Sequence, residues 1–411
     1  MSRTLELLTF IFFALFVFAS PFSIALSQIA FGISLFCFIA LSFNGDVLPR
    51  LRPLNPVFRM IGIYLVWLTF SAYMSDRPVF SLSMLKEEWL FLIVPIGAYL
   101  CRDEKQCAIL IRIFAISVAL IAAYGILQYF THTHFLKPSA PDIIDGDRIR
   151  GNFSHPLTFA NFFGTASLFL LGTALSGKEW IKNRIGSLLV AASILGIFAV
   201  VLSSSRTAIA AILVILFVAA LVAGKKYFLP IGIIVVGILA AVILIPGSES
   251  RYLTQLPQDV NPGYEGGRPF IWKNSIDIIW DNPLFGVGTG NFYDEYVTRL
   301  KPDIYNAWKY SHAHNDILTV TVISGIPGGL LFIGVWLMVL RTLYRGLKRL
   351  PQNSAQRKWL IGSLLGCAFF LIASLTEATF QDEEVRQLLM FVWAVGLSVC
   401  LEEPKSELEL S

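Results

Sequence analysis

Long apolar runs alternate with short polar segments from one end of the chain to the other. Runs of about 18 or more apolar residues with few charges are typical of helices that cross a lipid bilayer. Because lipid offers the backbone no hydrogen-bond partners, such runs are expected to be helical. The pattern predicts about twelve spanning helices, at residues 6–21, 23–43, 57–74, 84–101, 106–130, 156–176, 185–203, 207–223, 227–246, 316–343, 358–377 and 386–402.

Composition supports this interpretation and excludes a chain of two or three soluble domains. Hydrophobic residues make up 55% of the 411 residues and charged residues only 15%. The mean hydropathy of +0.67 lies outside the range of soluble globular proteins. The five cysteines include no CxxC pair, so neither a zinc site nor a disulfide framework is indicated. We therefore predict an all-α polytopic membrane protein.

The short connections alternate in charge, which predicts their sidedness. Cytoplasmic loops of membrane proteins carry an excess of lysine and arginine. One set of connections is basic and the opposite set carries few positive charges, so both termini are expected on the cytoplasmic side. The basic set contains Arg50 and Arg52, Arg102 and Lys105, Lys178 to Arg184, Lys225 and Lys226, and the stretch from Arg341 to Lys358.

Two longer polar segments, residues 131–155 and 247–315, then fall on the outer side. We predict nine spans in residues 1–246, a periplasmic loop with short helices in 247–315, and three spans with a short cytoplasmic tail in 316–411. No cytosolic catalytic domain is apparent, so chemistry that uses cytosolic ATP is not expected. All five histidines lie on the outer side: His132, His134, His155, His312 and His314.

Arg206 is the first candidate for a binding role. It lies between two predicted spans, among the hydroxyl residues of LSSSRTA. An arginine at a helix end can simply extend toward the headgroups. However, its planar guanidinium also binds phosphate through two parallel hydrogen bonds, and ionisable groups at membrane depth often serve function.

Arg268, in the sequence GGRPFIW, is the second candidate for a binding role. Pro269 favours a helix that begins here, and Asn282-Pro283 favours its end. Ile271, Trp272, Ile276, Ile279 and Trp280 recur at helical spacing and predict an amphipathic helix on the outer membrane face. The helix dipole disfavours a cation at a helix N-terminus, so Arg268 and the free amides are expected to share an anion.

Two further motifs give weaker signals. Gly286 to Gly290, GVGTG, follows no predicted strand and lacks the spacing of a nucleotide-binding loop, so a flexible turn is expected. The sequence DGDRIRG contains Asp145 and Asp147, a pair that would suit a divalent metal ion.

The sequence SHAHND, residues 311–316, carries the catalytic candidates His312 and His314. Histidines two residues apart share a face in a strand, which would suit a metal, but diverge by roughly 160–200° in a helix. The apolar run that follows predicts a helix N-terminus capped by Ser311 or Asn315. The helix dipole disfavours an imidazolium there, and a neutral imidazole can accept a proton from a hydroxyl.

A carboxylate is expected to orient the catalytic histidine. Three outer-side candidates are Asp277, Glu377 and Asp382. Sequence spacing does not choose among them.

Together these motifs resemble the O-antigen ligase and polymerase superfamily of integral membrane glycosyltransferases of the GT-C type. The resemblance rests on SSSRTA, GGRPFIW, SHAHND followed by IL, and the later SGIPGGLLF. It implies transfer of O-antigen from undecaprenyl diphosphate to the lipid A–core oligosaccharide. It also implies that Arg206 and Arg268 bind the donor diphosphate and that His314, or failing that His312, is the base.

The expected chemistry needs neither a cofactor nor a metal. A sugar on a lipid diphosphate is already activated, one histidine can deprotonate the acceptor hydroxyl, and two arginines can stabilise the leaving diphosphate. Attack opposite the leaving group inverts the anomeric centre. We therefore predict an inner-membrane O-antigen ligase acting on the periplasmic side.

Several alternatives remain open. A polymerase of the same superfamily would use the same donor but a second lipid-linked glycan as acceptor. A metal-dependent transferase would use Asp145 and Asp147. A protein O-oligosaccharyltransferase is less expected because no soluble domain follows the last span. A transporter is less expected because the chain shows no internal symmetry.

Overall fold

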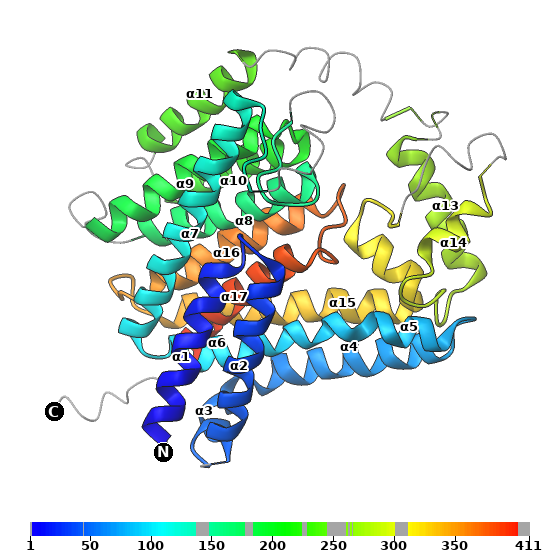
Figure 1. Cartoon of the computed structure of the whole chain (residues 1–411), viewed down its shortest axis with the longest axis horizontal. Coiled ribbons are helices and arrows are strands. Elements are labelled where there is room, and N and C mark those ends of the chain that lie inside the picture. The colour runs from blue at the N-terminus through cyan, green and yellow to red at the C-terminus, as the bar shows by residue number, and fades with distance from the viewer. Residues whose placement is uncertain are drawn as a thin grey trace.

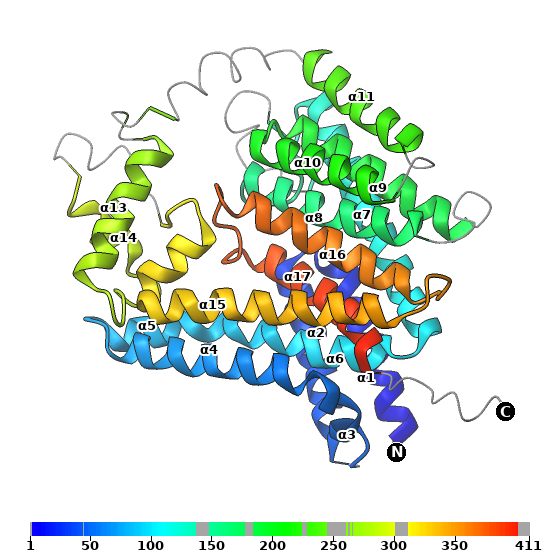
Figure 2. The ribbon, with the colours of Figure 1, turned by 180° about the vertical axis from the view of Figure 1, so that it is seen from behind.

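The computed structural model describes residues 2–43, 45–136, 148–176, 184–223, 228–244, 260–261, 264, 266–300 and 311–401. Within these ranges the chain forms helices joined by turns, and no strand occurs in them. The predicted all-α, polytopic fold is confirmed. Figures 1 and 2 show the helices packed into one bundle, with α13 (Arg268–Asp281) and α14 (Phe292–Val297) set to one side of it.

Eight helical segments of the described chain are long and apolar enough to cross a membrane. The remaining four predicted spans coincide with shorter helical segments: α10 (Arg206–Ala223), α11 (Phe228–Leu244), α16 (Arg357–Ala373) and η2–α6 (Leu85–Leu92 and Ile93–Cys101). The eight segments contain α1 (Ser2–Ala19), α2 (Ile24–Ser42), α3–η1–α4 (Val47–Leu51, Arg52–Leu54 and Asn55–Tyr73), α7 (Glu104–Thr131), α8 (Pro156–Leu175), α9 (Arg184–Leu202), α15 (Asp316–Arg349) and α17–η5 (Glu383–Ser398 and Val399–Leu401).

The span expected at residues 84–101 differs from a single α-helix. A short helix, α5 (Pro78–Met84), precedes it, and residues 85–92 form a 3₁₀-helix before α6 begins at Ile93. Pro95 explains the boundary, because proline has no N–H to donate and is tolerated in the first turn of an α-helix but not in its interior.

Helix α8 lies at the centre of the bundle, against α9 and α16, and nearly all of its residues are buried. Small residues allow this close packing. A Cβ atom added at Gly164 would lie 2.0 Å from the ring of Phe369, and one added at Gly362 would lie 2.6 Å from the carbonyl oxygen of Phe169. Membrane helices commonly approach each other through such small residues.

Helix α15 is not one straight span, because it is kinked at Gly325. This residue has φ 71° and ψ 175°, a conformation that L-residues rarely adopt. The loop that contains GVGTG packs against the kink, with Val287 N donating to Val322 O (2.9 Å) and Ile326 N donating to Pro283 O (2.8 Å). The GVGTG segment is therefore an ordered turn that fixes the end of α13 to α15.

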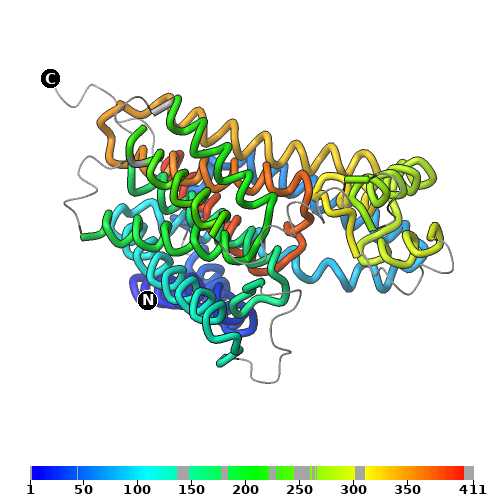
Figure 3. Tube along the Cα trace, turned by 90° about the horizontal axis from the view of Figure 1, so that it is seen from above, coloured from blue at the N-terminus to red at the C-terminus, as the bar shows by residue number. Residues whose placement is uncertain are grey.

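Helices α13 and α14 share a small core of their own with the first turns of α15. Ile271, Ile278, Phe292 and Ala313 are all buried in it. Of the positions that predict an amphipathic α13, Ile271 and Ile279 pack into this core, whereas Ile276 and Trp280 are exposed on its surface. Figure 3 shows this unit beside the first part of α15, at one end of the bundle.

The connections expected on the outer side meet at one end of the bundle. Hydrogen bonds join segments far apart in sequence there: Asn152 with Phe22, Thr158 with Asp382, Thr376 with Thr207, and Asp316 with Ser374. These hydrogen bonds hold the ends of α8, α10 and α15 against the segments next to α1, α16 and α17. In Figures 1 and 2, α1 begins and α17 ends at the opposite end of the bundle.

Candidate active site

The segment that carries the two candidate histidines forms a tight turn before α15. Asn315 is the N-cap, and its Oδ1 accepts from Leu318 N at 2.9 Å. This confirms the predicted cap. The turn is possible because His314 adopts a left-handed conformation with φ 49°, which is uncommon for a residue with a side chain.

This turn brings the two imidazole rings into contact, whereas in a helix they would diverge. The ring centroids of His312 and His314 are 4.5 Å apart and the rings are nearly perpendicular. His314 N donates to Nδ1 of His312 at 3.2 Å, so this nitrogen carries no proton. Burial, followed by the neighbouring His314, lowers the pKa of His312 to about 4. His312 is therefore neutral at physiological pH.

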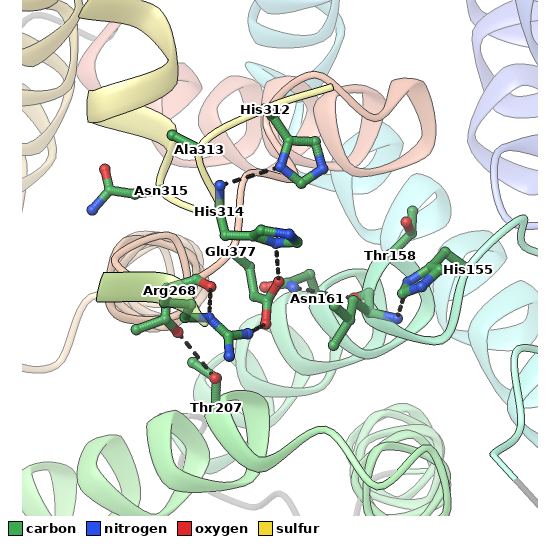
Figure 4. Close-up of polar contacts among 12 residues, drawn as sticks. His155, Thr158, Asn161, Thr207, Arg268, His312, Ala313, His314, Asn315 and Glu377 are labelled. Atoms are coloured by element: carbon green, nitrogen blue, oxygen red, sulfur yellow. Dashed lines mark hydrogen bonds and ion pairs between the residues drawn. The ribbon is translucent and has the colours of Figure 1, made fainter. Parts of the chain in front are cut away.

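Glu377 joins His314 to Arg268. Its Oε2 lies 3.5 Å from Nδ1 of His314, and its Oε1 accepts from Nη2 of Arg268 (Figure 4). Glu377 is 2% exposed, whereas the side chains of His314 and Arg268 are 18% and 25% exposed. The carboxylate is thus enclosed, while the imidazole and the guanidinium both reach the surface of the site.

The charge state of Glu377 follows from these two contacts. Burial opposes ionisation, but the adjacent imidazole of His314 and the positive charge of Arg268 outweigh it, so the pKa of Glu377 lies below its ordinary value. An ionised carboxylate can only accept hydrogen bonds. The Nδ1 that faces it therefore carries the proton in a neutral His314, which leaves Nε2 as the basic nitrogen.

Arg268 is held by a second contact on the same segment. Its Nε donates to the carbonyl oxygen of Thr376 at 2.8 Å. With Nη2 bound to Glu377, Nη1 remains without a partner among the described residues. Arg268 begins α13, as predicted. The negative charge expected beside it is supplied, at least in part, by the carboxylate of Glu377.

Arg206 begins α10, and the next residue reaches the same segment. Thr207 and Thr376 form a hydrogen bond between their hydroxyl groups at 3.0 Å (Figure 4). The start of α10 therefore adjoins the segment that holds Arg268 and Glu377. The sequence indicated Thr207 among the hydroxyl residues around Arg206, but it gave no sign of Thr376 as its partner.

The segment from Ser374 to Asp382 is fixed from several sides. Asp316 N donates to Ser374 O at 3.1 Å, and Asp316 Oδ1 accepts from Phe380 N at 3.0 Å. Arg386 Nε donates to Phe380 O at 2.8 Å and its Nη1 pairs with Glu88 at 2.9 Å. These buried contacts position the backbone on both sides of Glu377.

The other predicted residues are placed as follows. Asp277 is exposed on α13, and Asp382 bonds to Thr158 at 2.7 Å rather than to a histidine. Of the three orienting candidates, the structure therefore places Glu377 beside His314. Asp145 and Asp147 lie outside the described residues, so the metal alternative built on them stays untested. Among the residues that are described, no group of three or more potential ligands is arranged for a metal ion.

A comparison with protein families agrees with the motifs. Residues 191–333 match the family model described as O-antigen ligase. This match covers about a third of the chain and supports an O-antigen ligase family member. The matched region contains Arg206, Arg268, His312 and His314, whereas the orienting Glu377 lies beyond it. A search of curated proteins finds none that matches this chain.

The match supports the ligase and polymerase superfamily for this chain and suggests a glycosyltransferase-like enzyme.

Proposed function

We propose that the protein is an O-antigen ligase, which transfers a glycan from undecaprenyl diphosphate to the lipid A–core oligosaccharide. The contact that carries the proposal is the one between Glu377, His314 and Arg268. In this contact an imidazole and a guanidinium approach the two oxygens of one buried carboxylate in a partly open site. A base and an anion-binding group are what transfer from a lipid diphosphate requires.

His314 acts as the base. Its Nε2 takes the proton from the acceptor hydroxyl while the hydroxyl oxygen attacks the anomeric carbon. The bond between that carbon and the diphosphate oxygen breaks, and the lipid diphosphate leaves with the bonding electron pair. Attack from the opposite face inverts the anomeric centre. Glu377 stabilises the imidazolium that forms, as a carboxylate does for a histidine base in other enzymes.

Arg268 and Arg206 bind the donor diphosphate. Nη1 of Arg268, which has no partner in the part of the chain that the structure describes, is available to a phosphate oxygen, while Nε and Nη2 keep the guanidinium in place. Arg206 supports the second phosphate from the start of α10. Negative charge grows on the leaving group during the reaction, and cationic groups in a partly desolvated site stabilise such charge strongly.

The proposed location is the bacterial inner membrane, with both termini in the cytoplasm and the site facing the periplasm. The charge distribution of the connections supports this orientation. The reaction as written needs no metal ion. Activity that EDTA abolishes and that an added divalent ion restores would contradict this part of the proposal.

Reconstitution with two acceptors tests the proposed function. Purified protein in proteoliposomes is given a lipid-diphosphate-linked glycan and either lipid A–core or a second lipid-linked glycan. Extension of lipid A–core is the expected result. Extension of the lipid-linked glycan alone would identify a polymerase. Movement of the donor across the membrane without extension of either acceptor would identify a transporter.

A further inference from the structure

A second polar feature lies at the same end of the bundle, apart from the two arginines. It is a cavity of about 480 Å³ between the α1–α2 turn, the segment before α8, η2 and the start of α17. We call it the acidic cavity. It is lined by Ser20, Pro21, Phe22, Ser23, Ile24, Glu87, Asn152, Phe153, Ser154, Gln381, Asp382, Glu383 and Glu384.

The lining of the acidic cavity would repel the donor diphosphate. It includes four carboxyl groups and no lysine or arginine, and the nearby Arg386 and Lys86 offset only part of the charge on Glu87 and Glu383. Like charges disfavour binding unless a counter-charge is present. The diphosphate therefore belongs with Arg268, and the acidic cavity must take a ligand of different chemistry.

Hydroxyl groups are the ligand chemistry that the lining suits. Carboxylates and side-chain amides accept hydrogen bonds from hydroxyls, and serines and Asn152 add further donors and acceptors. Two aromatic rings, Phe22 and Phe153, supply apolar surface for the carbon skeleton of a sugar. Burial raises the pKa of Asp382 to about 7, so this group can donate as well as accept near neutral pH.

The acidic cavity adjoins the proposed reaction centre through α8. Asp382 accepts from Thr158 at 2.7 Å, and Thr158 lies one turn after His155 at the start of that helix. His155 is close enough to His312 for its charge to lower the pKa of His312. Figure 4 draws Thr158 and His155 together with the histidine pair and Glu377.

We propose that the acidic cavity binds the acceptor glycan by its hydroxyl groups, next to the base and on a different surface from the donor diphosphate. This inference rests on the proposed function and adds to it the place of the second substrate. It assigns specificity for the acceptor to the α1–α2 turn and the start of α17.

Two isosteric substitutions test the assignment. Glu87→Gln and Glu384→Gln each remove one charge from the lining and keep its shape. Glu104→Gln, an exposed carboxylate at the start of α7, serves as the matched control. Acceptor KM, donor KM and kcat are measured separately in proteoliposomes. A hydrogen bond to a charged group is worth about a tenfold change in affinity or more, so we expect acceptor KM to rise about tenfold in both cavity variants.

Donor KM and kcat at saturating acceptor should stay within about twofold of the wild type, which also shows that the variants fold. An unchanged acceptor KM, or an equal rise in donor KM, would overturn the assignment. An acceptor effect that disappears in EDTA and returns with calcium would also overturn it, because the direct occupant would then be a cation.

A binding measurement separates this inference from the proposed function. Titration of His314→Ala protein with soluble core oligosaccharide should give saturable binding that Glu384→Gln weakens about tenfold, whether or not the wild type transfers. Binding without wild-type transfer would leave the cavity assignment standing and refute the proposed function. Transfer by the wild type, together with binding that Glu384→Gln does not weaken, would refute the cavity assignment and leave the proposed function standing.

Discussion

Replacement of Glu377 by glutamine should disable the proposed base without removing it. The amide has almost the same shape as the carboxylate but lacks its charge. Its oxygen can still accept from Arg268, which turns its NH₂ group toward Nδ1 of His314. Nδ1 must then accept rather than donate, so the proton moves to Nε2. The nitrogen that should take the acceptor proton is no longer basic.

The size of the effect follows from the 3.5 Å separation of Nδ1 and Oε2. Coulomb's law gives about 5 kcal/mol for unit charges at this distance with an effective dielectric constant of about 20, and about 1 kcal/mol in bulk water. Glu377 is buried and His314 is partly exposed, so the loss for the developing imidazolium falls between these limits. We expect kcat to fall by about 10²- to 10³-fold.

Single-turnover transfer from a radiolabelled donor measures this step. Asp294→Asn, which removes an exposed carboxylate paired with Arg77, is the control and should keep wild-type rates. Donor KM should change little in Glu377→Gln, because Arg268 keeps one hydrogen-bond acceptor there. A Glu377→Gln rate within about threefold of wild type would refute the tautomer argument.

Three further outcomes are expected. Arg268→Lys should raise donor KM at least about tenfold in transfer assays, because an ammonium group cannot hold Thr376 and Glu377 while it also binds phosphate; an unchanged KM would contradict this. Arg386→Met should destabilise the protein by about 3–5 kcal/mol in denaturant titrations by leaving buried Glu88 unpaired, and Glu88→Gln in the same chain should recover part of the loss. Burial raises the pKa of Asp382 from 3.8 to about 7, with Glu384 and Glu377 opposing its ionisation and Arg386 and Thr158 favouring it. The folded state therefore keeps a proton that the unfolded chain releases, and stability should fall as pH rises from about 4 to about 7. Asp382→Asn should flatten the melting temperature over that range, and an unaltered profile would show that the group does not titrate there.

Much of the fold could be predicted because lipid imposes simple rules on sequence. Every predicted span coincides with helical structure, since apolar runs in a membrane have no other way to satisfy the backbone. The details that escaped prediction depend on single residues. Pro95 decides where α6 begins. Gly325 permits the kink in α15, because it adopts φ 71° and leaves room for the Leu284 carbonyl, which would lie only 2.1 Å from a Cβ atom there.

The site was predictable in its residue types but not in its connections. Arg268 and His314 stood out as polar residues at predicted helix starts. The choice of Glu377 over Asp277 and Asp382 depends on how the turn after α16 folds back, which spacing does not reveal. The contact between the two histidine rings depends on the left-handed backbone of His314, and no periodic pattern encodes that.

The most direct test compares His314→Ala with His312→Ala in single-turnover transfer, with donor binding measured on the same preparations. We predict that His314→Ala loses transfer by at least about 10²-fold while it binds the lipid-diphosphate donor as the wild type does. His312→Ala should retain measurable transfer, because His312 supports the turn and does not take the proton. Near-normal transfer by His314→Ala would contradict the assignment of the base, and with it the proposed active site.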